Sequence, residues 1–232
     1  MVQVIQGKGY GTATIKKEIE LIHKLSGRIP EIAIDIGGNI GEYTAELRRL
    51  NSNLEIHTFE PSITNIKKLN ARFGSDTLIK VLPFAVSDTK GTATLFSDKA
   101  GSGLGSLTKR NLDHFNIDFN VVEKIETIRF EDYWKENLNE RVLDIVKMDI
   151  EGHELKALKG FGKAINSINV IQFEFGGTNI DTRTYFRDFW YFFKECGFIL
   201  YRITPLGAEL IRTYRESDEY FMTTNFIAVK RK

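Results

Sequence analysis

A short β-branched run that enters a cluster of glycines constrains this fold more than any other feature of the chain. Residues 31–36 (EIAIDI) have the character of a strand, and residues 37–41 (GGNIG) follow directly. Residues 40–50 then place apolar side chains on one helical face. Glycines let the backbone approach a ligand closely, and the amides of a helix start favour a partner with lone pairs or negative charge. The pattern therefore predicts a strand–loop–helix unit that contacts a ligand, with a tight turn that binds nothing as the alternative.

Strand-like and helix-like segments alternate along the rest of the chain, which is typical of a mostly parallel sheet with helices on both faces. Further strands are predicted over residues 54–60, 78–83, 92–97, 142–150, 170–175, 198–204 and 226–229. Helices are predicted over residues 12–26 and 183–196, after Pro61 and after Gly152. Residues 98–120 are rich in Gly and Ser and predict a long loop of the kind that serves as a lid or binding segment. The predicted fold class is a doubly wound, mostly parallel α/β domain with an N-terminal helix.

Length and composition limit the number of domains and the kinds of partner. At 232 residues the chain fits one domain, which we assign to residues 31–232, with residues 1–30 as an N-terminal helical cap. The 32 Lys and Arg nearly cancel the 31 Asp and Glu, which argues against a nucleic-acid partner. The single cysteine, Cys196, excludes an internal disulfide. Signal-peptide and membrane-span patterns are absent, so we expect a cytoplasmic protein without a membrane partner, and a homo-oligomer stays open.

An acidic residue after the second strand points to a nucleoside-containing ligand. Glu60 ends that strand, where a carboxylate is well placed to accept the hydroxyls of a ribose. The glycines do not have the G-x-G-x-x-G spacing of a dinucleotide site. Asp35 at the mouth of the loop would repel a pyrophosphate but attract the ammonium group of a methionine moiety. This charge argument favours S-adenosylmethionine over NAD as the cofactor.

A second acidic cluster follows the strand over residues 142–150. Asp149 comes at its carboxyl end, and Glu151 and His153 come on the turn that opens the next helix. Ionisable groups at this edge of an open α/β sheet commonly perform acid–base chemistry. His153 is the first candidate for a general base because imidazole changes charge near neutral pH, with Asp149 and Glu151 as alternatives. Glu151 and Glu154 also fit the simpler role of helix-start charges.

The sequence predicts no metal site. The four histidines are scattered, and none has a paired spacing such as H-x-x-x-H. One alternative stays open for a divalent ion, the pair of Asp149 and Glu174, which lies near the end of a later strand.

Five motifs together resemble the FkbM family of methyltransferases. They are AIDIGGNIGEYT (33–44), HTFEPS (57–62), FAVSD (84–88), GSLT (105–108) and KMDIEGHELKALKG (147–160). They occur in the family's order, and the resemblance covers roughly residues 30–176. It implies the seven-stranded, Rossmann-like sheet of the class I methyltransferases, with a reversed last strand that the segment 226–229 would supply.

The resemblance also implies positions for the cofactor. Carried over residue by residue, the contacts would be Asp35, Gly37, Asn39 and Gly41 for the methionine and ribose, Glu60 for the ribose diol, Pro61 and Ser62 beside the adenine, and Ala85 and Val86 against its ring. Tyr43, on the helix after the glycines, and Ser106, in the Gly- and Ser-rich loop, complete the predicted contacts. Phe84 departs from the family pattern, because similar sequences often carry a small polar residue there.

The function that these observations predict is S-adenosylmethionine-dependent O-methylation of a hydroxyl on a small molecule or glycan, with Asp149, His153 and Glu151 as candidate catalytic residues. One alternative is an NAD-dependent oxidoreductase or epimerase. Another is a non-catalytic interaction module that uses the aromatic helix over residues 183–196.

Overall fold

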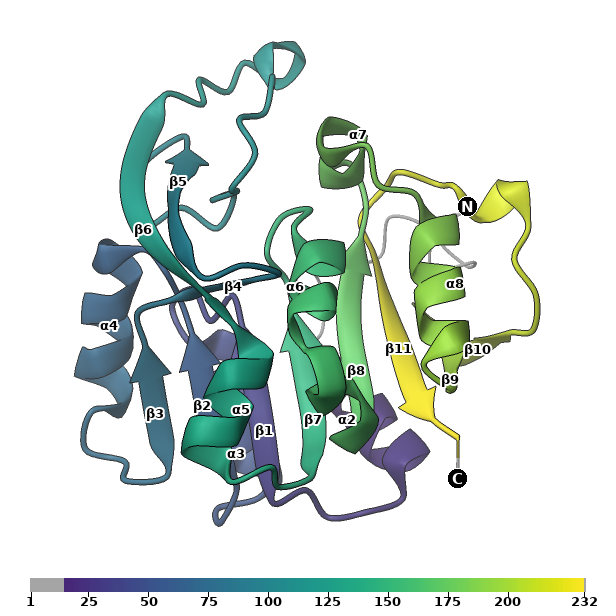
Figure 1. Cartoon of the computed structure of the whole chain (residues 1–232). Helices are drawn as coiled ribbons and strands as arrows, with labels where there is room; N and C mark the ends of the chain where they lie inside the picture. The colour runs from purple at the N-terminus through teal and green to yellow at the C-terminus, as the bar shows by residue number, and fades with distance from the viewer. Residues whose placement is uncertain (1–14, 232) are drawn as a thin grey trace.

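Eight strands form one twisted sheet in the computed structural model, which describes residues 15–231 (Figure 1). The strands are β1 (Ile32–Ile36), β2 (Glu55–Phe59), β3 (Ile79–Leu82), β7 (Leu143–Met148), β8 (Ile168–Phe175), β9 (Phe198–Thr204), β10 (Gly207–Ile211) and β11 (Thr224–Lys230). Their order is β10-β9-β11-β8-β7-β1-β2-β3. Strands β3, β2, β1, β7 and β8 are parallel, whereas β11 runs antiparallel to both β8 and β9. The predicted mostly parallel sheet with a reversed last strand is confirmed, and the β9–β10 hairpin adds an eighth strand at its edge.

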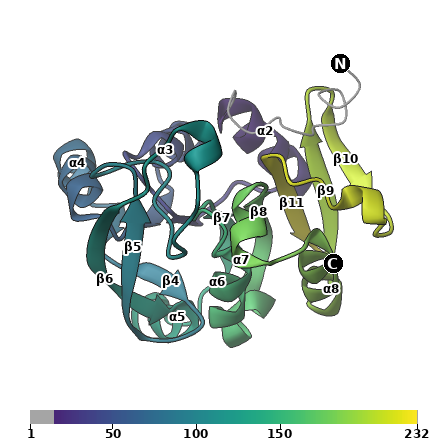
Figure 2. The same cartoon turned by 90° about the horizontal axis from the view of Figure 1, so that it is seen from above.

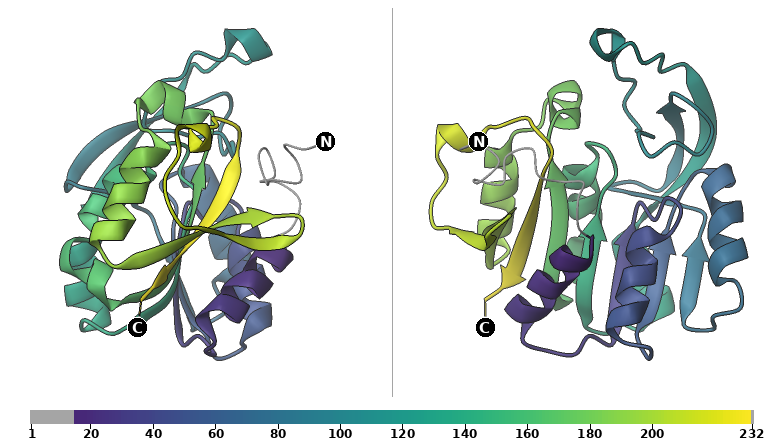
Figure 3. Two further views of the ribbon diagram at one scale, coloured as in Figure 1. Left: turned by 90° about the vertical axis from the view of Figure 1, so that its right-hand side faces the viewer. Right: turned by 180° about the vertical axis from the view of Figure 1, so that it is seen from behind.

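Helices cover both faces of this sheet, as predicted (Figures 1 and 3). One face carries α2 (Ile15–Ser26), α3 (Glu42–Leu50) and α4 (Ile63–Phe73), and the other carries α5 (Phe130–Leu138), α6 (Glu154–Gly160) and α8 (Phe186–Glu195). Short 3-10 turns occur at Asp113–Phe115, Gly162–Ser167 and Glu216–Asp218. Residues 12–14 of the predicted first helix lie outside the described residues. No helix among residues 15–231 is long and apolar enough to span a membrane.

The N-terminal helix α2 packs directly on the sheet. Its apolar spacing buries Ile19 and Ile22 in the same core cluster as Tyr43 and Leu47 of the neighbouring α3. Glu18 is also buried, and its carboxylate accepts hydrogen bonds from the Gln172 side chain of β8 at 2.7 Å and from the Asn225 side chain of β11 at 3.0 Å. The assignment of residues 1–30 as a separate cap stays a prediction, although α2 itself shares the core of the sheet.

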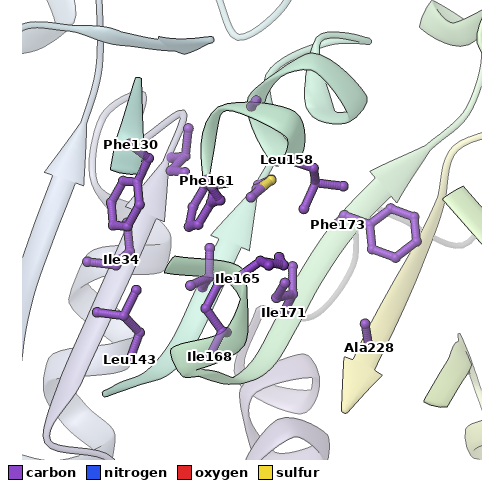
Figure 4. Packing of buried hydrophobic residues seen from close by; sticks show 14 of the residues in the cluster. Ile34, Phe130, Leu143, Leu158, Phe161, Ile165, Ile168, Ile171, Phe173 and Ala228 are labelled. Carbon is purple, nitrogen blue, oxygen red and sulfur yellow. The ribbon is translucent and has the colours of Figure 1, made fainter. Parts of the chain in front are cut away.

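Aromatic and aliphatic side chains form the core on the opposite face, and Figure 4 shows Phe130, Phe161 and Phe173 among them. Phe130 stacks on Phe161 with ring centroids 4.1 Å apart. Phe173 of β8 stacks on Phe189 of α8 at 5.1 Å and on Phe226 of β11 at 5.4 Å. Aromatic pairs of this kind contribute about 0.5–1.5 kcal/mol each beyond the apolar area that they bury. The aromatic stripe of α8 is therefore used to hold the helix on the sheet.

The predicted helix over residues 183–196 is interrupted at its start. A short helix, α7 (Thr178–Thr182), precedes α8, and Arg183 between them adopts a left-handed conformation with φ of 53°. A residue in that conformation ends an α-helix, so α8 begins only at Phe186.

A second, three-stranded sheet lies beside the carboxyl ends of the main strands (Figure 2). It contains β4 (Ala85–Ser87), β5 (Gly91–Ser97) and β6 (Val121–Arg129), in the order β4-β6-β5. The predicted loop over residues 98–120 connects β5 to β6 and rises above the main sheet (Figure 1). A backbone bridge between Phe96 and Ser106 folds part of this loop back onto β5. Neither β6 nor α5 was predicted from the sequence.

Candidate functional site

A pocket with an open volume of about 700 Å³ lies at the carboxyl ends of β1, β2 and β7. Most of the predicted site residues line it: Gly37, Asn39, Glu60, Pro61, Ser62, Ala85, Val86, Asp149, Glu151 and His153. They come together because the carboxyl ends of neighbouring parallel strands meet at one edge of the sheet, where ligands of open α/β folds bind. The second sheet and the loop over residues 98–120 close the pocket from above.

Four of the predicted site residues do not line this pocket, and two of them are Asp35 and Gly41. Asp35 is fully buried beneath it, and its carboxylate accepts a hydrogen bond from the hydroxyl of Thr44 at 2.7 Å. Gly41 begins α3 and packs under α4, where a Cβ would lie 2.4 Å from the ring of Phe73. Asp35 therefore acts on the pocket through its charge, and Gly41 through the position of α3.

Tyr43 and Ser106 also point away from the pocket. The Tyr43 hydroxyl donates a hydrogen bond to the side-chain oxygen of Gln172 at 2.6 Å. The Ser106 hydroxyl donates to the backbone carbonyl of Glu151 at 2.7 Å. Ser106 therefore joins the loop over residues 98–120 to the turn after β7.

The glycine cluster serves close packing between β1, β2 and β7. Gly37 has a φ of 83°, and a Cβ on it would lie 2.0 Å from the carbonyl oxygen of Asp149. The amides of Gly37 and Gly38 both donate to the carbonyl of Phe59, at 2.9 and 3.0 Å. These two amides are therefore occupied within the protein.

Glu60 binds two backbone amides at one end of the pocket. One carboxylate oxygen accepts a hydrogen bond from the amide of Asn39 at 2.8 Å, and the other accepts one from the amide of Ser62 at 2.9 Å. Burial raises the pKa of Glu60, and these two amides counteract the rise. The Asn65 side chain also donates to this carboxylate and lowers the pKa. The buried Ser62 hydroxyl has no hydrogen-bond partner among the described residues, so this end fits a ligand with several hydroxyls or ring nitrogens.

The loop over residues 98–120 supplies much of the pocket roof. Gly101 has a φ of 69°, and a Cβ there would lie 2.7 Å from the side-chain oxygen of Asn65. The roof residues are Gly101, Ser102, Gly103, Gly105 and Leu107. The lid role that the glycines predicted is consistent with this position.

Sequence reasoning missed several lining residues. They are Ile36, Phe59, Leu95, Ser97, Glu123 and Ile150, together with Phe84, which was noted only as a departure. Leu95, Ser97 and Glu123 come from β5 and β6. Alternation of apolar and polar residues marked β5 as a strand, but no local pattern indicated that its sheet lies over the pocket.

Beside the Asp149 end of the pocket, several carboxylates surround one buried cation. The Lys147 ammonium lies 3.5 Å from the Asp35 carboxylate and 3.6 Å from that of Asp149. It also donates a hydrogen bond to the carbonyl of Gly37 at 3.2 Å. Burial lowers the pKa of Lys147, but Asp149 and Asp35 outweigh that effect, so the pKa is raised overall. Lys147 therefore stays charged.

Burial and mutual repulsion shift the other acids toward their protonated forms. Burial, followed by the charge of Asp149, raises the pKa of Glu151 to about 8, although Arg110 opposes the rise. The same two causes raise the pKa of Glu174 well above its ordinary value. Among the described residues, no group of three or more His, Cys, Asp or Glu is arranged to hold a metal ion.

His153 lies at the edge of the pocket next to β4. Its Nε2 is 2.9 Å from the hydroxyl of Ser87. Burial and, to a smaller extent, the charge of Lys156 together lower the pKa of His153 to about 4. The imidazole is therefore a much weaker base than free histidine.

Glu154 provides a test of the electrostatics at this end of the site. Burial raises its pKa from 4.5 to about 7, while the amide of Ile150 donates to it at 2.9 Å. The folded protein therefore binds more protons than the unfolded chain between these two pH values, so stability falls as pH rises from 4.5 to 7. We expect Glu154→Gln to remove this fall. Urea unfolding measures the free energy of unfolding of both proteins. From pH 4 to pH 8, the value for the variant should rise by about 3 kcal/mol relative to that for the wild type. A difference that does not change with pH would contradict the raised pKa.

The comparisons with known proteins agree with this geometry. A family model, the methyltransferase FkbM domain, matches residues 35–200. No curated protein matches the sequence.

Three solved structures with a similar fold are distant from this chain in sequence. A protein assigned as an O-methyltransferase from Klebsiella pneumoniae has a TM-score of 0.52 at 9% identity, covering 95% of this chain and 81% of that chain. A protein assigned as a caffeoyl-CoA O-methyltransferase from Staphylococcus aureus has a TM-score of 0.51 at 10% identity, covering 99% and 89%. A protein assigned as a methyltransferase from Streptococcus mutans, in complex with SAH, has a TM-score of 0.49 at 12% identity, covering 92% and 97%. The first two of these structures show that the chain has the class I methyltransferase fold.

Proposed function

This chain belongs to the FkbM family of methyltransferases and uses S-adenosylmethionine as its cofactor, and from this premise we propose that it methylates a hydroxyl group of a small molecule or glycan. The observation that carries the proposal is one pocket with two chemically different ends. Glu60 and the unpartnered Ser62 hydroxyl lie at one end, and Asp149 and Glu151 lie at the other. The comparisons favour neither an NAD-dependent enzyme nor a non-catalytic module.

In this proposal the residues that line the pocket after β1 and β2 would hold the cofactor. Glu60 accepts hydrogen bonds from the ribose hydroxyls, and Pro61 and Ser62 border the adenine. Ala85 and Val86, which line the same side of the pocket, pack against its ring. Asp35 and Asp149 provide negative charge near the methionine end. When bound, S-adenosylmethionine supplies an electrophilic methyl group on a positively charged sulfur.

Glu151 is the residue that we assign as the proton acceptor for the hydroxyl. A general base is most effective when its pKa lies near the working pH, and the pKa of Glu151 is raised to about 8. His153 is a poorer base because its pKa is lowered to about 4. Asp149, with 42% of its side chain exposed, is free to orient the acceptor.

Two measurements, made one after the other, test this function. Calorimetric titration with S-adenosylhomocysteine beside NAD should show micromolar binding of the former alone. The protein should then be incubated with methyl-¹³C-labelled S-adenosylmethionine and a panel of sugars, phenols, aliphatic alcohols and amines. Proton–carbon correlation spectra distinguish an O-methyl from an N-methyl product. We expect O-methyl signals from a hydroxyl acceptor, and signals only from the amines would overturn the proposal.

A further inference from the structure

Arg110, in the loop over residues 98–120, joins three separate parts of the molecule. Its Nη1 lies 3.2 Å from a carboxylate oxygen of Glu151, on the turn after β7. Its Nε lies 3.0 Å from a carboxylate oxygen of Asp181, on α7. The three side chains are only 10%, 15% and 24% exposed. The contact is therefore shielded from solvent, where a charge pair is screened less than on the surface.

The same loop is tied to Glu151 a second time. The Ser106 hydroxyl donates to the Glu151 backbone carbonyl at 2.7 Å. Glu151 itself has a φ of 53°, a left-handed conformation that is uncommon for a residue with a side chain. Residues held in such conformations cluster at active sites, where the surroundings determine them. The loop thus holds both the backbone and the carboxylate of the residue that we assign as the base.

We propose that Arg110 is a positioning residue: its guanidinium holds the Glu151 carboxylate at the acceptor end of the pocket, and Asp181 holds the guanidinium. This inference rests on the function proposed above. Arginine suits the role because its planar fork donates to two carboxylates in fixed directions and keeps its charge at any working pH. Lysine, a compact charge on a flexible stem, cannot reproduce both contacts.

The charges around Glu151 make the contribution of Arg110 measurable. Three nearby carboxyl groups disfavour a negative charge on Glu151. They belong to Asp149 after β7, Glu154 on α6 and Glu174 at the end of β8. Lys147 and Arg110 are the two cations that oppose them. Removing the charge of Arg110 should raise the pKa of Glu151 above its present value of about 8. Less of the Glu151 carboxylate is then ionised at neutral pH.

The test follows the titration of Glu151 directly, without an acceptor. Protein labelled with ¹³C at the glutamate side-chain carboxyl is titrated by NMR, and Glu151→Gln identifies the signal. We expect Arg110→Gln to raise the pKa of Glu151 by about one unit, and Arg110→Lys to raise it less. The matched control is Arg129→Gln, because Arg129 pairs with Glu131 at 2.8 Å and with Asp132 at 4.0 Å on a different element. That control should leave the Glu151 signal unchanged.

Kinetics separate positioning from a merely structural role. In Arg110→Gln we expect the acid limb of the kcat profile to move to higher pH by the same amount, about one unit, so that activity recovers at alkaline pH. A structural role would instead lower kcat at every pH. If Arg110→Gln fails to fold, Arg110→Met, which also removes the charge, carries the test. A nearby charge is expected to shift the pKa by about one unit. A shift of the Glu151 pKa by less than about 0.3 unit in a folded variant that lacks the Arg110 charge would therefore overturn the inference. Absence of hydroxyl methylation by the wild type would overturn the proposed function, and the NMR titration keeps the two failures distinct.

Discussion

Replacing Lys147 by Met is expected to lower the free energy of unfolding by about 4 kcal/mol, because removing one partner of a buried ion pair leaves the other charge uncompensated. Only 9% of the Lys147 side chain and none of the Asp35 side chain is exposed. One Asp35 oxygen has no hydrogen-bond partner among the described residues, so Lys147 supplies its compensation through charge. The Gly37 carbonyl, which accepts a hydrogen bond from the Lys147 ammonium, also loses this donor. Urea unfolding of both proteins at pH 7 measures the difference.

Two further variants show whether the loss comes from the uncompensated charge. The double variant Lys147→Met/Asp35→Asn removes both charges and should recover about half of the lost stability, since an uncharged pair avoids the burial of a lone carboxylate. Lys80→Met is the matched control: Lys80 also lies on a strand, but it is 51% exposed and 3.5 Å from Glu55. An exposed pair of this kind contributes at most about 1 kcal/mol. A Lys147→Met variant as mild as the control would contradict the assigned role of the buried lysine.

Replacing Glu60 by Ala is expected to weaken the binding of S-adenosylhomocysteine by about 1,000-fold, because hydrogen bonds to a charged group contribute about 1.5–3 kcal/mol each. The change removes the acceptor that we assign to the ribose hydroxyls. It also releases the amides of Asn39 and Ser62, which shape the pocket wall. Glu60→Gln keeps one acceptor oxygen, so we expect a smaller loss of about 10-fold. Calorimetric titration measures both affinities.

The control for this series is Glu42→Ala. Glu42 begins α3 near the pocket but does not line it, and 59% of its side chain is exposed in a pair with Arg72. Its replacement should leave the affinity unchanged. Circular dichroism must show that Glu60→Ala is folded, and a folded Glu60→Ala protein that binds S-adenosylhomocysteine as well as wild type would remove Glu60 from the cofactor site.

The sequence predicted the elements that depend on local pattern. The β-branched run before Gly37 forms β1, and the apolar spacing of residues 40–50 forms α3. Parallel topology then brings the carboxyl ends of β1, β2 and β7 to one edge, so residues that follow those strands meet in a pocket. For this reason most of the predicted site residues line it. Of the second sheet, β5 was predicted and β6 was not. Apolar and polar residues alternate only weakly in β6, and a long loop separates β6 from its partner β5.

Residue types and strand order were thus sufficient to predict that Glu60 and Asp149 meet in one pocket. The direction and burial of each side chain depended on tertiary packing. Asp35 lies beneath the pocket because its position on β1 faces Thr44 and Lys147, and the pKa of His153 is lowered because α6 buries the imidazole beside β4. The Arg110 contacts join residues 41 and 71 positions apart along the chain. Such contacts arise where separate elements converge and exclude water, and no periodicity within any one element encodes them.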